Sequence, residues 1–366
     1  MTRTVRLVLV GLWAGVLAGL AMAASTGAGA GELDRAYLRG SAVDQPSYPI
    51  QPNMDAADPR PLGYPVKGVA PELAPTPAPI AHAFEVEFGG RYWASTGKLA
   101  KNLYDVFGVS QSVLSRLTYR GLASNSGEVY GRAENAGGIF VKGYTGLGGI
   151  GKGSLNDEDF PPGVDPYSST LSNQQNGKLS YLSADIGYEI ASGPRYRVGA
   201  FVGYHYFAER VNAFGCTQVA ANPSVCAPTI PPAVLGITED AKWNAVRLGL
   251  AADVKIMDRL KLAVDAAWVP YATITASDTH WLRLGTSFSG PIPESGSGSG
   301  AQVEAALSYQ LTDAFSFGAG ARYWHLEARG SADFGSVVPG ATPQPVNFVT
   351  DRFGAYLQGA YRFGML

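Results

Sequence analysis

Hydrophobic and polar residues alternate with a period of two over much of the chain after residue 82. Similar alternation runs through 182–190, 243–256, 259–268 and 353–363. In 259–268 the opposite face carries small or charged residues such as Lys261 and Asp265. Successive side chains of a strand point to opposite faces, so each stretch predicts a β-strand with one apolar face. The clearest apolar face consists of Leu260, Leu262, Val264, Ala266 and Trp268.

Strands of this kind fit either a soluble sandwich, which buries the apolar face, or a membrane barrel, which points it at lipid. The predicted strands are about ten residues or longer, the length that a tilted membrane strand needs. The chain also ends in an alternating strand containing Tyr361 and Phe363. Aromatic residues gather near the strand ends, as in the girdles of membrane barrels. They are Tyr92, Trp93, Tyr204, Tyr206, Trp268, Tyr271, Tyr323 and Trp324.

Short and long connections alternate along the chain. Tight turns are predicted at 123–127, 191–194, 257–258 and 312–313. Long polar loops are predicted at 97–112, 148–176, 215–241, 275–299 and 329–350, with a flexible loop end at 296–300. Four turns and five loops join ten strands and leave both barrel termini in the periplasm. The predicted fold class is therefore all-β, a ten-stranded antiparallel transmembrane β-barrel with long extracellular loops.

The residues before the barrel predict export. Arg3 and Arg6 precede an apolar run, and an A-x-A cleavage motif follows at 21–23, so 1–23 is interpreted as a signal peptide. The Pro-rich residues within 24–81 predict an extended periplasmic tail or linker. Residues 82–366 form the predicted barrel. The expected location is the bacterial outer membrane, crossed many times, with the active face outside the cell.

Composition limits the functions that this chain can have. A net charge of −2 with 16% charged residues argues against a nucleic-acid partner. A ten-stranded barrel is narrow, and its predicted inner faces carry charges of both signs that must pair, so a diffusion pore is not expected. Cys216 and Cys226 share one predicted loop of an exported chain and are expected to form a disulfide. No cluster has metal-ligand spacing, and no metal or other cofactor is predicted.

Two pairs of residues could carry chemistry. Asp157 and Asp159 stand two apart in one predicted loop, and Asp278 and His280 stand two apart in another. If the strands continue upward, this spacing puts both members of each pair on one face. The preceding strands lie four apart in a ring of ten, so the pairs would face each other across a groove. His280 would then act as general base, oriented by Asp278, while the aspartate pair positions a water molecule.

These residues resemble those of the omptins, ten-stranded outer-membrane aspartyl-histidine proteases. Asp157 and Asp159 match the family's aspartate pair, and Asp278 and His280 match its Asp-x-His dyad. Trp281 and Arg283 match the aromatic-x-Arg that follows the dyad, and 115–119 resembles the second strand. The resemblance covers roughly 83–366. It implies an outer-membrane endopeptidase that acts on polypeptide substrates and contacts outer-membrane lipid, with lipopolysaccharide as one candidate.

The chain departs from the family at the substrate pocket. The family's preference for basic residues rests on two acidic positions, which fall here at Lys101 and Ala276. Two alternatives therefore remain: a catalytically decayed omptin-like barrel that serves as an adhesin or structural protein, and a small transport barrel. The intact Asp157, Asp159, Asp278 and His280 favour the protease. His82, His205 and His325 lack a partner at motif spacing, and we expect structural roles for them.

Overall fold

The computed structural model describes residues 84–105, 112–160, 165–222 and 224–365. Within these ranges the chain forms β-strands and two short 3-10 helices, η1 (Trp281–Arg283) and η2 (Phe334–Ser336). The strands are β1 (Phe84–Tyr104), β2 (Val113–Asn135), β3 (Ile139–Asp159), β4 (Ser168–Gln174), β5 (Gly177–Gly193), β6 (Tyr196–Gln218), β7 (Ile230–Met257), β8 (Leu260–His280), β9 (Ile292–Gln310), β10 (Phe315–Ala332) and β11 (Gln344–Met365).

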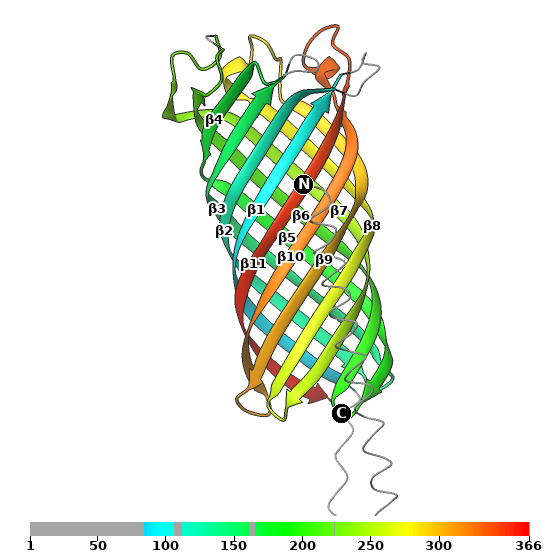
Figure 1. Cartoon of the computed structure of the whole chain (residues 1–366). Helices are drawn as coiled ribbons and strands as arrows, with labels where there is room; N and C mark the ends of the chain where they lie inside the picture. Colours follow the sequence, from blue (N-terminus) through cyan, green and yellow to red (C-terminus); the bar gives the residue numbers. More distant parts are fainter. Residues whose placement is uncertain (1–83, 106–111, 161–164, 223, 366) are drawn as a thin grey trace, which may run out of the picture. The chain divides into compact units, whose positions relative to one another are not determined.

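The strands close into a barrel (Figure 1). β1 pairs antiparallel with both β2 and β11, so the sheet has no free edge there. β4 and β5 both lie between β3 and β6 and together make one barrel strand, interrupted at Gln175 and Asn176. The eleven strands therefore form a ten-membered antiparallel ring. The predicted fold class is confirmed. The predicted signal peptide and tail lie outside the described residues.

The outer surface of the barrel carries an apolar band. Alternating outward residues are large and exposed, and they include Trp268 (57%) and Leu357 (65%). Tyr271 lies at the upper edge of this band, beyond which outward residues on its strand become small or polar. Such a band, edged by aromatic residues, is the surface that a membrane barrel presents to lipid. No helix among the described residues is long and apolar enough to cross a membrane.

Three of the four predicted tight turns are found, and one prediction was wrong. Residues 123–127 lie inside β2, and the turn that joins β2 to β3 is at 136–138. Ser124 and Ser126 are small because they are buried in the barrel interior. Ser126 Oγ lies 3.1 Å from the hydroxyl of Tyr181, which occupies the space that a larger residue would need. Small polar residues therefore indicated a turn where they instead accommodate aromatic rings.

The predicted long loops occur, but each is shorter than expected because the strands continue into it. The observed connections are 105–112, 160–167, 219–229, 281–291 and 333–343. The predicted flexible segment 296–300 is part of β9. A Cβ on Gly298 would lie 2.0 Å from the carbonyl oxygen of Glu327, and one on Gly300 would lie 2.1 Å from that of His325. These glycines let β9 and β10 approach closely, so they do not mark a loop.

The connection after β6 contains the two cysteines. Cys216 and Cys226 form a disulfide with a Cα–Cα distance of 5.7 Å. Cys216 lies within β6, and Cys226 lies in the loop that follows it. The bond therefore ties this loop to the end of the strand.

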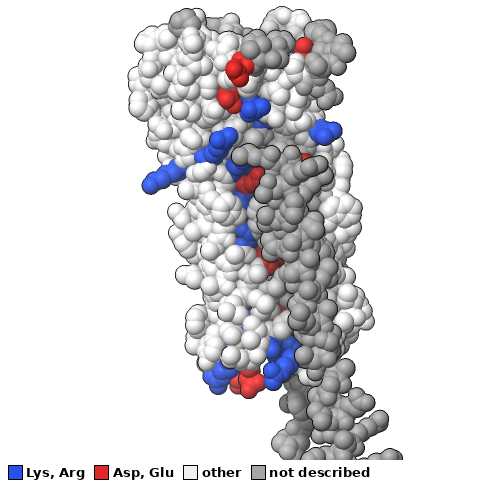
Figure 2. Space-filling model, in the orientation of Figure 1, with Lys and Arg blue, Asp and Glu red and all other residues white. Residues whose placement is uncertain are grey.

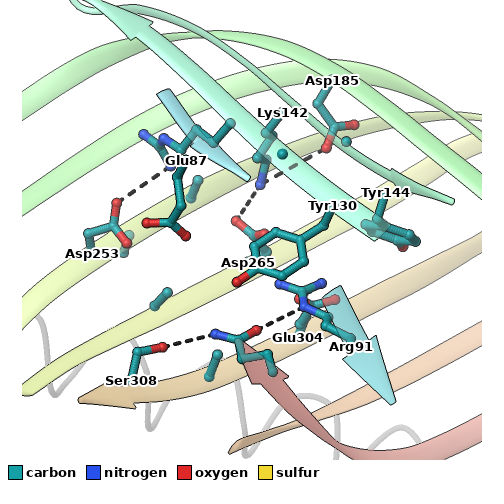
Figure 3. A pocket seen from close by; sticks show the side chains of 18 of the residues that line it. Glu87, Arg91, Tyr130, Lys142, Tyr144, Asp185, Asp253, Asp265, Glu304 and Ser308 are labelled. Atoms are coloured by element: carbon teal, nitrogen blue, oxygen red, sulfur yellow. Dashed lines mark hydrogen bonds and ion pairs between the residues drawn. The ribbon is translucent and has the colours of Figure 1, made fainter. Parts of the chain in front are cut away.

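The interior contains paired charged side chains as well as a buried apolar core. Arg322 is 2% exposed; its Nη1 lies 2.7 Å from Glu128 Oε2, and its Nε lies 2.5 Å from Glu304 Oε2. Further toward the turns, a cavity of about 100 Å³ is lined by ion pairs, among them Lys142 with Asp265 (Figure 3). These pairs confirm that the interior charges compensate one another. An interior crossed by such pairs leaves little room for a diffusion channel.

Replacing Arg322 with Met should destabilise the barrel by about 3 kcal/mol or more, because removal of one partner leaves buried carboxylates uncompensated. Chemical denaturation of the refolded protein in detergent micelles measures the loss. Arg329→Met is the matched control, since Arg329 is an exposed residue of the same strand. Equal stability of the two variants would contradict a structural role for the Arg322 ion pairs.

Candidate functional site

The candidate site lies where the strands rise beyond the apolar band. On β8 the outward residues after Tyr271 are Thr273, Thr275 and Ser277, so this part of the strand no longer faces lipid. A register shift at 269–272, which contains Pro270, precedes the extension. Proline cannot donate to the ladder and is accommodated at such irregularities. The interior-facing residues of this extension are Ile274, Ala276, Asp278 and His280.

Asp278 and His280 interact directly. His280 Nε2 lies 3.2 Å from Asp278 Oδ2, and Asp278 is 4% exposed. An ionised carboxylate only accepts hydrogen bonds, so Nε2–H donates to Asp278 and Nδ1 is left as the basic nitrogen. Both residues belong to β8 rather than to the predicted loop. The spacing of two residues thus places both side chains on the inner face, as predicted.

Asp157 and Asp159 occupy the corresponding end of β3. They follow the buried Leu155 at spacings of two, which places them on the same inner face of the strand. In the ring, β3 and β8 are separated by the β4–β5 strand, β6 and β7. The charges of His280 and Asp278 both act on Asp157. The structure therefore brings the two predicted pairs together across the mouth of the barrel.

Proximity and burial change the acidity of the aspartate pair. Burial raises the pKa of Asp157 to about 7; the charge of Asp159 adds to the rise, and that of His280 opposes it. Burial also raises the pKa of Asp159, against a hydrogen bond from Ser115 and the charge of Arg283. Near neutral pH the pair therefore carries less than its full negative charge, which lets it both accept and donate hydrogen bonds.

In the Asp278–His280 pair each group stabilises the charged form of the other. Burial alone would raise the pKa of Asp278, but the positive charges of His280 and Lys101 hold it well below its usual range. Burial would lower the pKa of His280, but the carboxylate of Asp278 more than offsets this and raises it. Asp278 is therefore an anion at neutral pH, and His280 is a stronger base than an isolated imidazole.

The two predicted pocket positions have different surroundings. Ala276 is 5% exposed and lines the interior one step below Asp278. Lys101, on β1, is 2% exposed and contacts Asp278, Glu239 and Glu294. Neither predicted position is acidic, but β7 and β9 place two glutamates, Glu239 and Glu294, against Lys101. Sequence reasoning missed both glutamates, since only the strand register places Glu239 opposite Asp278.

The three carboxylates of Asp278, Glu239 and Glu294 form the cluster that we call the acidic cage. One oxygen of each lies within 4.8 Å of the others, a geometry that could hold a metal ion. Lys101 Nζ approaches all three carboxylates, at 2.6 Å from Glu239, 2.7 Å from Asp278 and 2.8 Å from Glu294. The ammonium group thus supplies the cation of the acidic cage.

Two other histidines lie elsewhere. His325 Nδ1 lies 2.8 Å from Asp351 Oδ1, although no partner was expected, because Asp351 comes from the neighbouring strand. By alternation with the buried Trp324, His325 faces outward. His205 is fully buried against Trp324, with ring centroids 4.8 Å apart. The fourth, His82, lies outside the described residues.

Comparison with known proteins shows similarity of fold. No family model matches the chain, and no curated protein matches it in sequence. The outer membrane protease OmpT from Escherichia coli aligns with a TM-score of 0.61 at 13% identity, covering 76% of this chain and 97% of that one. This likeness shows a shared barrel fold and no more.

Two further structures are much less similar. Ail, the attachment invasion locus protein of Yersinia pestis, gives a TM-score of 0.24 at 10% identity, covering 76% of this chain and 98% of its own. The toluene transporter TodX of Pseudomonas putida gives 0.28 at 10% identity, covering 79% and 92%. Neither similarity is high enough to indicate the function of this chain.

The Asp278–His280 contact predicts a measurable titration. His280 should take up its proton above the ordinary histidine value of about 6.5, and Asp278→Asn should lower that midpoint by about one pH unit or more by removing the anion. NMR of histidine-labelled protein in micelles measures both midpoints. Asp351→Asn, which alters the outward His–Asp pair, should leave the His280 midpoint unchanged. An equal midpoint in wild type and Asp278→Asn would contradict the coupling.

Proposed function

We propose that this protein is an outer-membrane endopeptidase that hydrolyses peptide bonds with a water molecule activated at the barrel mouth. The observation that carries the proposal is the contact of His280 with the buried Asp278, facing Asp157 across the interior. A base oriented by a carboxylate, opposite a second acidic pair, is suited to activating water. The matching residues of the omptins and the barrel fold shared with a protease support the proposal.

In the proposed reaction, water lies between His280 and the aspartate pair. Nδ1 of His280 takes a proton from the water while the water oxygen bonds to the scissile carbonyl carbon, and the π electrons of the C=O bond move onto the carbonyl oxygen. That pair re-forms the C=O bond as the amine leaves. Asp278 stabilises the imidazolium that results. When the carbon–nitrogen bond breaks, His280 returns the proton to the leaving amine. Asp157 and Asp159 orient the water by accepting and donating hydrogen bonds, and no covalent intermediate forms.

His280→Ala should reduce peptide cleavage by about 10²- to 10⁴-fold, the usual effect of losing a general base. Asp278→Asn should reduce it nearly as much, because the imidazole loses its orientation and its counter-charge. Initial rates on a diverse peptide library, with lipopolysaccharide supplied, measure the effect. His325→Ala is the matched control, since it removes a histidine from the outward His–Asp pair. Full activity of His280→Ala would refute the mechanism.

Asp157→Ala and Asp159→Ala should also lower the rate, while heat-resistant migration on gels shows that the barrel remains folded. Metal chelators should leave the rate unchanged. The rate should fall as pH drops through the raised pKa of His280, because the protonated imidazole cannot accept a proton. Absence of cleavage by the wild type across the library would favour the adhesin, structural or transport alternatives.

We also propose a specificity that does not require Arg or Lys before the scissile bond. Lys101 already occupies the acidic cage, and Ala276 offers no charge to a substrate cation. Mapping the cleaved bonds by mass spectrometry measures this preference. Strict cleavage after basic residues would contradict it.

The proposed location places 1–23 as a signal peptide, 24–81 as a periplasmic tail and the long connections outside the cell. Basic side chains project from the upper part of the barrel surface (Figure 2). Six successive barrel strands each carry at least one outward cation beyond the apolar band. From this position the cations could meet anionic lipid headgroups, including lipopolysaccharide. These cations include, one per strand, Lys98, Arg120, Lys152, Lys178, Arg210 and Lys242.

An epitope tag inserted at Ser287, in the connection after β8, should be labelled on intact cells. A tag at Asp313, in the turn between β9 and β10, should be labelled only after the outer membrane is opened. Antibody labelling of whole and permeabilised cells tests both. The reverse pattern would overturn the proposed orientation.

A further inference from the structure

Lys101 reaches the proposed catalytic pair from a strand outside both halves of the site. It lies on β1, whereas the aspartate pair lies on β3 and the Asp278–His280 pair on β8. Its side chain is 2% exposed, and its ammonium has three carboxylate partners within 2.8 Å. A buried lysine normally loses its charge unless it is paired, so this number of partners keeps Lys101 a cation.

Lys101 and His280 share a single oxygen. Asp278 Oδ2 lies 2.7 Å from Lys101 Nζ and 3.2 Å from His280 Nε2, while Asp278 Oδ1 has no hydrogen-bond partner among the described residues. The carboxylate is therefore held from below by the ammonium and presents to the imidazole the oxygen that the ammonium already partly neutralises. Two donors on one oxygen weaken each other, because each reduces the negative charge available to its competitor.

We propose that Lys101 is a positioning residue for the reaction: it fixes the Asp278 carboxylate beneath His280 and limits how strongly that carboxylate holds a proton on the imidazole. This inference deepens the proposed hydrolytic function and rests on it. Lys101 does not touch the substrate. It keeps His280 from becoming so basic that the imidazole stays protonated, and therefore inactive as a base, at neutral pH.

Charged and titratable groups face this cluster from several strands. β1 provides Lys101, β7 provides Glu239, β9 provides Glu294, and β8 provides Asp278 and His280. From β2 and β3, the interior contributes Tyr119 and Asp157, and η1 contributes Arg283, which acts on Asp157.

Among these groups the cations are Lys101 and Arg283, together with His280 when it is protonated. Lys101 opposes protonation of His280, while Asp278 and Asp157 favour it. Removing Lys101 should therefore make His280 more basic, provided that Asp278 remains ionised.

The sharpest variant keeps Asp278 ionised while removing the cation. In Lys101→Met/Glu239→Gln/Glu294→Gln the acidic cage loses its ammonium and the two carboxylates that would otherwise compete for protons. Asp278 then faces His280 alone. Compared with Glu239→Gln/Glu294→Gln, which differs from it only in retaining Lys101, the triple variant should show a His280 NMR midpoint higher by about one pH unit or more, the shift expected when a like charge at close range is removed. The acidic limb of the cleavage rate should move upward by the same amount.

Lys255→Met is the matched control, because Lys255 is an exposed lysine near the turn end of β7. It should leave both the midpoint and the rate profile unchanged. Heat-resistant migration on gels shows which variants are folded. If the triple variant does not fold, Glu239→Gln/Glu294→Gln, which retains Lys101, provides the second test. In that variant Asp278 is the one carboxylate of the acidic cage that remains as a partner of the Lys101 ammonium. The His280 midpoint should therefore fall relative to wild type.

A His280 midpoint in a folded triple variant equal to that of the double variant would overturn the proposal, as would a midpoint of the double variant unchanged from wild type. The NMR readout needs no enzymatic activity. A shifted midpoint without cleavage by the wild type would therefore refute the proposed function while supporting the Lys101–His280 coupling. Cleavage by the wild type with unshifted midpoints would refute the role of Lys101 alone.

Discussion

The antiparallel pairing of β1 with β11 closes the sheet, and the rest of the structure depends on that closure. In a closed ring every strand forms backbone hydrogen bonds with two neighbours. The outer face can therefore be apolar without leaving backbone groups unpaired in lipid. Closure also fixes which residues meet inside. Lys101 on β1 reaches Asp278 on β8 only because the ring brings distant segments of the chain to one interior.

The narrow ring buries many of the interior charges, among them Arg322, Glu128 and Lys101. Such charges persist only in pairs, and the interior accordingly holds Arg322 with Glu128 and Glu304 at one level and Lys101 with the acidic cage at another. The same physics acts on the candidate site. Burial raises the pKa of Asp157, whereas nearby cations keep Asp278 ionised. One carboxylate of the site, Asp157, is thus more easily protonated than usual, and another, Asp278, is less easily protonated. Such a separation of pKa values gives the two groups different roles in acid–base chemistry.

The periodicity of two predicted the barrel and the facing pairs, because strand geometry alone converts an i, i+2 spacing into a shared face. It underestimated the strand lengths. Beyond the lipid band the outward residues of β8 are small or polar, while inward residues such as Ile274 and Leu155 are apolar and buried. The apolar face thus moves from the outside of the barrel to its inside, so the pattern of the lipid band does not extend to the true strand ends. Residues 296–300 show this failure most clearly, since their glycines are needed for close strand packing rather than for a loop. Glu239 and Glu294 escaped detection because they join the site only through register across strands.

The central claim is that two pairs of residues, on β3 and β8, hold a reactive water between them. A crystal structure of the protein at neutral pH tests this claim most directly. The account predicts an ordered water within about 3.2 Å of His280 Nδ1 that also contacts a carboxylate of Asp157 or Asp159. A mouth in which the pairs are separated by side chains, with no water shared between them, would contradict it.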